Sequence, residues 1–107
     1  MVATDLEEGK KMEFVILVQG RAAPDRVDVV KKASVVLARD GSNDPGAIYY
    51  AVYQTEDDPA LFTVFARFKS KADWQRQIES AYHEKFWQSL PEDAWDVHPK
   101  RINLIGL

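Results

Sequence analysis

The chain has 107 residues, of which 46% are hydrophobic and 29% charged, and its formal net charge is −3 at pH 7. This length supports one domain with one core, and the composition is typical of a soluble globular protein. The acidic balance argues against binding to nucleic acid or acidic membranes, which need basic surfaces. The chain has no cysteine, which excludes disulfides, thiolate metal sites and a cysteine nucleophile, and suits a reducing, cytoplasmic location.

The sequence begins with a polar segment, Met1 to Lys11, that lacks the apolar core of a signal peptide. No segment of the sequence reaches transmembrane length. We expect a flexible tail over residues 1–11 and a single domain over residues 12–107. Within that domain, Met12 to Gln19 is a nearly continuous apolar run, which predicts a central strand that ends at Gly20.

A helix is predicted next, because Pro24 suits a first helical position. From Val27 to Leu37 the apolar residues share one helical face and the charged residues gather on the opposite face, so the helix is amphipathic. Gly41 is a typical C-terminal stop for such a helix.

Two β-rich runs follow, at Ala47 to Gln54 and at Leu61 to Phe68. The short loop between them, Thr55 to Ala60, predicts a hairpin. Both faces of the second run are largely apolar, so both faces of the sheet need cover.

Aromatic and charged residues of these two strands are divided between the faces of the sheet. Side chains alternate along a strand, so Tyr49 and Tyr53 lie on the face opposite Tyr50. In the second strand, Phe65 and Arg67 share one face. The sequence leaves open which face of the sheet meets the helices.

A second helical region starts near Ser70, whose spacing to Asp73 is that of a capping box. Apolar residues then recur every four positions from Trp74 to Leu90. Each step of four drifts by about 40°, so the row winds roughly 160° around a straight helix. One flat surface cannot bury such a row, and we expect a break near Ser80 to Tyr82 with two shorter helices meeting at an angle.

The last strand is predicted at Val97 to Leu107, after a connection from Pro91 to Trp95. The order strand, helix, strand, strand, helix, strand is that of a ferredoxin-like α+β fold with a four-stranded antiparallel sheet. Two helices cover only one face of such a sheet. Because the strands are apolar on both faces, we predict a homodimer packed sheet to sheet.

Several kinds of chemistry are disfavoured. The two histidines, His83 and His98, lie fifteen positions apart without a pattern of further ligands, which argues against a protein metal site. Scattered glycines exclude a phosphate loop and a dinucleotide fingerprint. The run LFTVFARFK lacks the glycine and the leading basic residue of an RNA-recognition motif. The acidic clusters Glu56-Asp57-Asp58 and Glu92-Asp93 fall in predicted loops, and we interpret them as solvated turn residues rather than paired catalytic carboxylates.

In this architecture the space between helices and sheet can hold a small ligand lined by apolar and aromatic groups. His83 is the natural general base there, because its imidazole titrates near neutral pH; the alternative is a hydrogen bond to the backbone at the helix break. Trp74 is a candidate wall, or else plain core packing. Arg67 either pairs with a carboxylate at the dimer interface or stabilises a ligand anion. The candidate binding residues are Tyr50, Tyr53, Phe65, Arg67, Trp74, Tyr82 and Phe86, with Arg101 as a further candidate.

The chain resembles the antibiotic biosynthesis monooxygenase (ABM) family from about Met12 to Ile105. The residues that carry the resemblance are Tyr50-Ala51-Val52-Tyr53-Gln54, the Asp58-Pro59 turn, Phe62, Phe68, Ser70, Trp74, and His83 with Phe86. This resemblance implies a dimeric α+β barrel. Several members of the family are oxygenases of quinols, anthrones and polyphenols that need no cofactor, whereas others degrade haem, isomerise small molecules or have no known activity.

For this chain the resemblance implies His83 as the base, a tyrosine or arginine that stabilises the substrate anion, and Trp74 and Phe86 as walls, with no metal or flavin. The rival interpretation is a non-catalytic dimeric domain that binds a small ligand or assists a pathway partner. Gln77 stands where many members have histidine. Gln77, Trp87 and Gln19 also occupy the positions nearest to the functional residues of the haem-degrading branch, which disfavours haem degradation.

Overall fold

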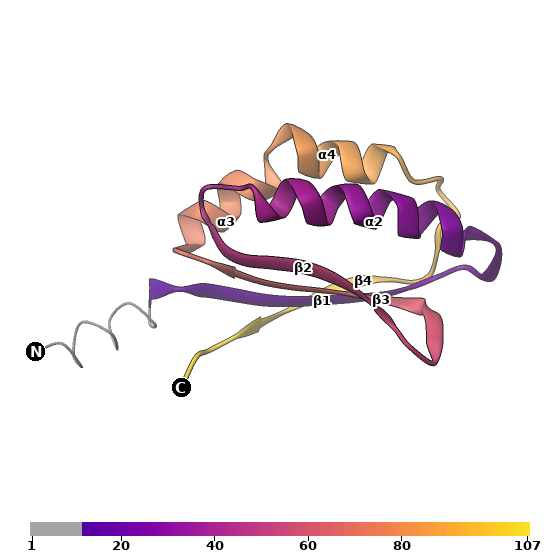
Figure 1. Cartoon of the computed structure of the whole chain (residues 1–107), viewed down its shortest axis with the longest axis horizontal. Coiled ribbons are helices and arrows are strands. Elements are labelled where there is room, and N and C mark those ends of the chain that lie inside the picture. The colour runs from indigo at the N-terminus through magenta and orange to yellow at the C-terminus, as the bar shows by residue number, and fades with distance from the viewer. Residues whose placement is uncertain (1–11) are drawn as a thin grey trace, which may run out of the picture.

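The chain folds into two layers, a sheet and a layer of helices on one of its faces (Figure 1). The computed structural model describes residues 12–107, so the predicted tail lies outside the described residues. The elements, in chain order, are β1 (Phe14–Ala22), the 3₁₀ helix η1 (Pro24–Arg26), α2 (Val27–Ser42), β2 (Ala47–Thr55), β3 (Asp58–Phe68), α3 (Lys71–Ile78), α4 (Ala81–Gln88) and β4 (Trp95–Leu104).

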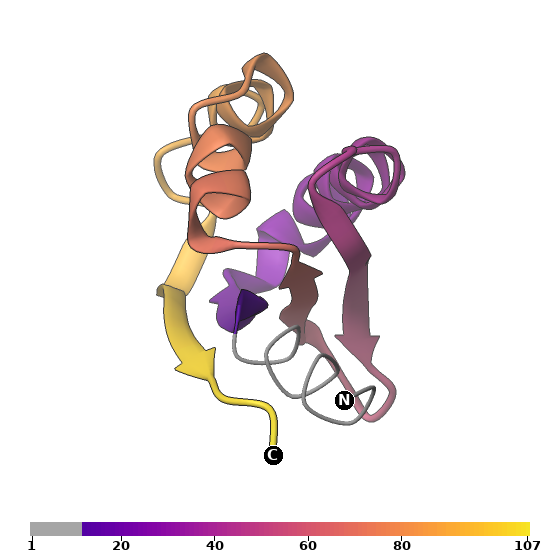
Figure 2. The same ribbon diagram turned by 90° about the vertical axis from the view of Figure 1, so that its left-hand side faces the viewer.

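The four strands form one antiparallel sheet in the order β2-β3-β1-β4. The first and third strands along the chain therefore lie in the centre, and the hairpin partner β2 and the last strand β4 form the edges. This is the order of a ferredoxin-like α+β fold, and the predicted fold class is confirmed. The end-on view shows all the helices on the same side of the sheet (Figure 2).

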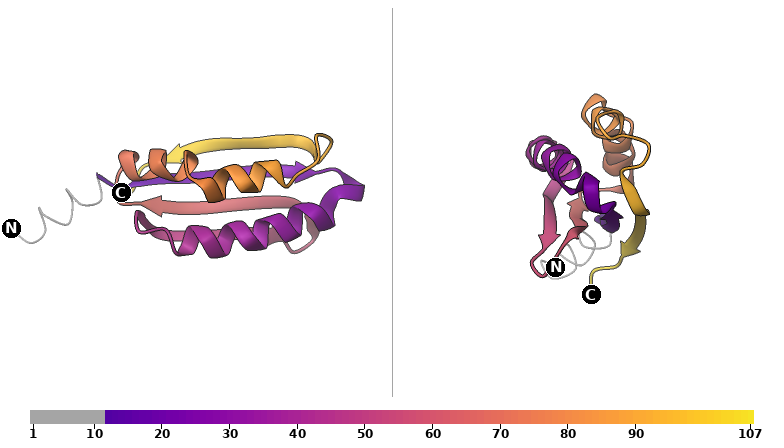
Figure 3. Two further views of the ribbon diagram at one scale, coloured as in Figure 1. Left: turned by 90° about the horizontal axis from the view of Figure 1, so that it is seen from above. Right: turned by 90° about the vertical axis from the view of Figure 1, so that its right-hand side faces the viewer.

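The helix layer has two halves that lie side by side. Seen from above, α2 runs along the β2 side of the sheet, whereas α3 and α4 run along the β4 side (Figure 3). The predicted break between the last two helices is confirmed, since α3 ends at Ile78 and α4 begins at Ala81. Ser70 caps α3 by accepting a hydrogen bond from the Asp73 N–H at 3.2 Å, and Ser80 caps α4 in the same way from the His83 N–H at 3.3 Å.

Two glycines expected to end elements lie inside them instead. Helix α2 continues through Gly41 to Ser42, and no described glycine has a positive φ. A Cβ at Gly41 would lie 2.4 Å from the ring of Tyr50, so close packing against β2, not a left-handed cap, requires glycine there. Strand β1 likewise continues past Gly20, where a Cβ would lie 2.7 Å from Pro99 of β4.

The pairing of β1 with β4 is irregular at Gly20. Gln19 pairs with Lys100 and Arg21 pairs with Val97, so the single residue Gly20 faces two residues of β4, His98 and Pro99. This two-against-one count is a β-bulge, which bends a strand and can redirect a side chain. A second shift follows directly, since Ala22 pairs with Trp95.

The two faces of the sheet differ in their cover. The helix-side face carries the buried core, including Ile16, Phe62, Ala66 and Phe68. The opposite face is left uncovered by the described helices, and apolar side chains are exposed on it, among them Tyr49, Tyr53, Ile102 and Leu104. We call this second surface the open face. It fits the predicted homodimer, which stays a prediction.

Candidate functional site

A cavity of about 440 Å³ lies between the helix layer and the sheet. Its floor consists of helix-side residues from the three strands β1, β2 and β3, and its walls come from α2, α3, α4 and β4. Most of the lining side chains are apolar or aromatic, as expected for a small-molecule site.

The cavity is closed at one side and open at the other. Tyr50, Trp74 and Gln77 line it and are buried, whereas the lining residues Ile78, His98 and Arg101 are exposed. The exposed residues belong to the end of α3 and to the edge strand β4, so the mouth lies beside β4. A ligand would therefore enter along the edge of the sheet and point its inner end towards α2 and α3.

His83 lines the cavity from the first turn of α4. The Ser80 hydroxyl, which accepts a hydrogen bond from the His83 backbone N–H, caps the start of that helix. Burial lowers the pKa of His83 below its usual value of 6.5, and the backbone of Ile78, which favours the protonated ring, opposes this shift only in part. The imidazole is therefore mainly neutral at pH 7 and available to accept a proton.

The indole of Trp87 joins the two histidines of the chain. Its ring centroid lies 6.3 Å from that of His83 and 5.6 Å from that of His98, and the His98 ring is stacked on it with an interplanar angle of 6°. Phe86 and Trp95 also pack against this indole, with centroids at 5.2 Å and 6.5 Å. The result is an aromatic wall that runs from α4 to the mouth of the cavity.

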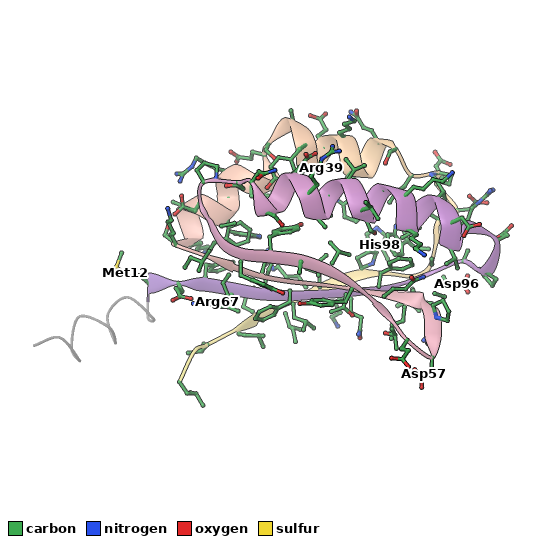
Figure 4. All side chains as sticks on the ribbon, in the orientation of Figure 1. Met12, Arg39, Asp57, Arg67, Asp96 and His98 are labelled. Atoms are coloured by element: carbon green, nitrogen blue, oxygen red, sulfur yellow. The ribbon has the colours of Figure 1, made fainter. Side chains whose placement is uncertain are left out.

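Sequence reasoning missed Trp87, Trp95 and His98 as residues of the cavity. Trp87 lines the cavity from α4, and Trp95 lines it from the start of β4. The irregular pairing of β4 with β1 explains the placement of His98, because the bulge opposite Gly20 brings His98 as well as Pro99 to the helix side. Figure 4 shows His98 between the helices and the sheet. The one signal in the sequence was the proline at position 99, which is common at a bulge or an edge.

Arg101 places a positive charge near the mouth. Its guanidinium carbon lies 4.2 Å from the centre of the Trp74 ring, a cation–π distance, and its strand partner Val18 lies on the cavity floor. No carboxylate of residues 12–107 forms an ion pair with Arg101. The charge is therefore available to an anion or an electron-rich ring in the cavity.

The structure brings together four of the predicted site residues and separates the other four. His83, Tyr50, Trp74 and Phe86 line the cavity, as does the further candidate Arg101. Tyr53, Phe65, Arg67 and Tyr82 do not line it.

Three of the separated residues lie on the open face. The Tyr53 hydroxyl bonds to that of Tyr49, and Phe65 packs against the Tyr49 ring at a centroid distance of 5.9 Å. Arg67 forms an ion pair of 2.9 Å with Glu13 of its own chain, below the sheet in Figure 4. These side chains cannot reach a ligand on the helix side, because the sheet lies between.

Tyr82 lies on the far side of its helix from the cavity. It lines a smaller hollow between α2 and α4, and its hydroxyl donates a 2.7 Å hydrogen bond to Asp44 Oδ2. Tyr82 therefore links α4 to the turn that follows α2 and does not line the cavity.

Each of the two acidic clusters contains an aspartate that forms an ion pair with an arginine of the same chain. Asp58 pairs with Arg21 at 2.8 Å and Asp93 pairs with Arg26 at 2.9 Å, and in both cases the arginine lowers the pKa of the carboxyl group. None of these residues lines the cavity. Residues 12–107 contain no group of three or more histidine or carboxylate side chains arranged to hold a metal ion.

Comparison with known proteins gives the family. The family model described as antibiotic biosynthesis monooxygenase (ABM) matches residues 13–98. The chain belongs to this family. The ABM resemblance inferred from the sequence is thus confirmed, and no curated protein matches the chain at a significant level. Within residues 12–107 there is no helix that is both long and apolar enough to span a membrane.

Solved structures similar to this ABM chain share its fold at low sequence identity. A protein from Nitrosomonas europaea that carries the antibiotic biosynthesis monooxygenase name is 21% identical with a TM-score of 0.82, over 91% of this chain and 92% of that one. One of the same name from Bacteroides thetaiotaomicron is 15% identical with a TM-score of 0.83, over 92% and 93% of the two chains. A conserved protein from Methanosarcina mazei is 16% identical with a TM-score of 0.81, over 94% and 98%. At these identities the likeness shows the fold alone.

Proposed function

We propose that this ABM protein is a cofactor-independent monooxygenase that acts on an aromatic quinol, anthrone or polyphenol-type small molecule. The observation that carries the proposal is the position of His83, partly buried on the wall of an aromatic-lined cavity of about 440 Å³, where burial lowers the pKa of its imidazole. A cavity of this size suits a flat ligand of two or three fused rings. A base with a pKa below neutral is present in its proton-accepting form at pH 7.

Anthrone illustrates the proposed reaction. His83 removes one proton from the methylene carbon, and the resulting carbanion, whose charge is shared with the ring oxygen, transfers electrons to molecular oxygen. The carbon–oxygen bond that forms gives a peroxide, which takes the proton back from His83. Loss of water then breaks the oxygen–oxygen bond and leaves anthraquinone. One oxygen atom enters the product and the other leaves as water, and the methylene carbon supplies all four electrons, so the reaction as proposed needs no metal or flavin.

The surroundings of His83 support this chemistry. Arg101 at the mouth favours the anionic form of the substrate, because its charge has no carboxylate partner among the described residues. Trp74 and Phe86 offer flat apolar walls for the rings. Burial, and the nearby Asp44, raise the pKa of Tyr50, so that its hydroxyl stays protonated and can donate a hydrogen bond.

We also propose that the protein acts as a cytoplasmic homodimer in secondary metabolism, with two open faces packed against each other. The open face exposes Tyr49, Tyr53 and Ile102 to the extent of 42%, 48% and 49%. An apolar sheet surface of this kind is typical of an interface. The cavity is lined by residues of one chain, on the other side of the sheet, so each subunit would have its own site.

The test is oxygen uptake by protein free of metal and flavin, with anthrone as substrate and the spontaneous rate subtracted. We expect His83→Ala to lower kcat about 100-fold or more, since general base catalysis typically contributes at least that factor. The dissociation constant for anthrone, measured anaerobically, and the melting temperature should change little. Gln88→Ala is the control, because Gln88 is exposed on the same helix and lies outside the cavity.

Equal losses of turnover and folding stability in His83→Ala would contradict the role of His83 as a base. The rival function is a non-catalytic dimeric domain that binds a small aromatic ligand. It is favoured if no substrate of a quinol and anthrone panel gives oxygen uptake while ligands still quench the fluorescence of Trp87 and Trp95.

A further inference from the structure

The inner end of the cavity holds an amide that the protein itself does not satisfy. Gln77 lies on α3, lines the cavity and is only 2% exposed. Its Nε2 atom is buried, and within residues 12–107 it has no hydrogen-bond partner. A buried amide without a partner costs about 1–3 kcal/mol, so folded proteins rarely retain one unless something else satisfies it.

The residues around Gln77 do not supply a hydrogen-bond partner for its Nε2 atom. Burial and the hydrogen bond to Asp44 raise the pKa of Tyr82, and the nearby Gln77 amide opposes that rise only in part. No hydrogen bond of normal geometry joins Gln77 to the Tyr82 hydroxyl, and the proton of that hydroxyl is already donated to Asp44 at 2.7 Å. Trp74, three residues earlier on the same face of α3, also lines the cavity, and no hydrogen bond joins it to the Gln77 amide.

The amide can turn towards a ligand without moving the helix. A half-turn about its Cγ–Cδ bond exchanges the positions of nitrogen and oxygen, which have nearly the same size. Ser34 of α2, 6% exposed, and Tyr50 of β2, 7% exposed, also line the cavity, and their hydroxyl groups are further neutral polar groups of its inner surface. The polar groups of the cavity therefore fall into two sets, a charged and titratable set on the mouth side and a neutral set at the inner end.

We infer that Gln77 donates a hydrogen bond to a carbonyl oxygen at the inner end of the ligand, and that the cavity thereby selects flat aromatic compounds that carry such an oxygen. The inference rests on the cavity of the proposed function, but not on any reaction with oxygen. The side chain acts as a positioning residue: with the carbonyl held at Gln77, the rings lie against Trp74 and Phe86 and the opposite end of the ligand points to the mouth.

The test compares two ligands of nearly the same shape, anthrone and 9,10-dihydroanthracene, which differ by the carbonyl oxygen. Dissociation constants are measured by tryptophan fluorescence under argon, so that neither compound is oxidised. We expect anthrone to bind the wild-type protein about tenfold more tightly, beyond any difference in solubility, since a buried donor gains a partner. In Gln77→Met, which keeps the length of the side chain but removes the amide, the two constants should become equal within about twofold.

The matched control is Gln75→Met on the same helix, because Gln75 is exposed and lies outside the cavity. It should keep the tenfold preference. Gln77→Leu repeats the test with a second apolar side chain if Gln77→Met fails to fold, and thermal unfolding checks both variants. A purely structural role of Gln77 would change the affinity for both ligands by the same factor and leave their ratio unchanged.

Two outcomes would overturn the inference: equal affinities for the two ligands in the wild-type protein, or a preference for anthrone that survives in Gln77→Met and Gln77→Leu. Either outcome leaves the role of His83 intact, because oxygen uptake is measured separately. Conversely, a Gln77-dependent preference for anthrone without any oxygen uptake would support the inference and contradict the proposed oxygenase.

Discussion

The two faces of the sheet are made from similar residues, but the helices bury only one of them. Phe68 and Phe65 belong to the same strand, three positions apart, yet the first is fully buried under the helices and the second lies half-buried on the open face. On the helix side, apolar side chains form the core and enclose a cavity. On the open face, the same kind of surface meets no helix of the described chain.

Apolar composition alone therefore does not tell a face that is covered within the chain from a face that is left open. A covered face is stabilised within the chain, and it can leave room for a ligand where the covering helices diverge. In the proposed homodimer the open face is buried against a second copy of the chain, so its contribution to stability depends on protein concentration.

The largest effect is expected from Phe68→Ala. Phe68 has no exposed surface and packs with Tyr50 in the core cluster, with ring centroids 6.3 Å apart. Removal of a buried phenylalanine side chain typically lowers the free energy of unfolding by about 3–5 kcal/mol. The measurement is urea unfolding followed by circular dichroism at low micromolar and at high protein concentration.

Phe65→Ala is the matched variant on the open face. At low protein concentration, where a dimer dissociates, Phe65→Ala should lower the free energy of unfolding clearly less than Phe68→Ala does. The loss of unfolding free energy caused by Phe65→Ala should increase with protein concentration. A cost for Phe65→Ala that is equally large and independent of concentration would mean that the open face is already covered within one chain.

A smaller effect is expected when a charge is placed on the open face with Ile102→Lys. Ile102 of β4 pairs with Leu17 of β1 and is 49% exposed, so the lysine costs the folded subunit little. In a sheet-to-sheet dimer the charge would be buried without a partner, and the dimer dissociation constant should rise about 100-fold. Analytical ultracentrifugation measures it.

Val35→Lys is the control for this charge, since Val35 is exposed on the outer side of α2, 64% accessible and away from the sheet. It should leave the dimer unchanged. A wild-type chain that stays monomeric at every accessible concentration would contradict the dimer and leave the open face for a different partner.

Local patterns in the sequence were sufficient for much of this architecture. The four-residue spacing from Trp74 to Leu90 predicted the break that separates α3 from α4, because helix geometry fixes how such a row winds. The spacing of Ser70 and Asp73 predicted a cap that the structure contains. His83 could be assigned to the cavity for the same reason, since it follows the break directly.

What the sequence could not supply depends on contacts between distant segments. The alternation of β2 and β3 divided the residues correctly into two sets, but both sets are apolar, so the sequence left open which set faces the helices. Tyr53 and Phe65 therefore stood among the candidates, although the structure places them on the open face. The placement of His98 depends on a bulge between β1 and β4, which arises from pairing across about eighty residues. The requirement for glycine at position 41 comes from the ring of Tyr50 on β2, which leaves no room for a Cβ atom, and no local pattern in the sequence reveals this contact.

The smallest effect concerns the covered face alone and comes from the pKa of His83. Burial holds this pKa below 6.5 in the folded chain, while in the unfolded chain the imidazole titrates at its ordinary value of about 6.5. As the pH falls below 6.5, the unfolded chain takes up a proton that the folded chain does not, so the free energy of unfolding decreases. Above 6.5 both states are neutral at this residue and the effect vanishes. The decrease should continue until the pH reaches the folded pKa, and it should be absent in His83→Gln.

The same pKa sets the pH dependence of the proposed activity. The rate should rise with pH through a value below 6.5 and stay level at neutral pH, because only the unprotonated imidazole accepts a proton. Protonation of Asp58 and Asp93 also lowers the free energy of unfolding. Because the pKa values of these carboxyl groups are lowered from 3.8 in the folded chain, that decrease occurs at lower pH than the decrease caused by His83. Urea unfolding of wild type and His83→Gln between pH 4.5 and 8 therefore isolates the histidine. Identical pH profiles for the two proteins would place His83 in solvent, outside the covered cavity.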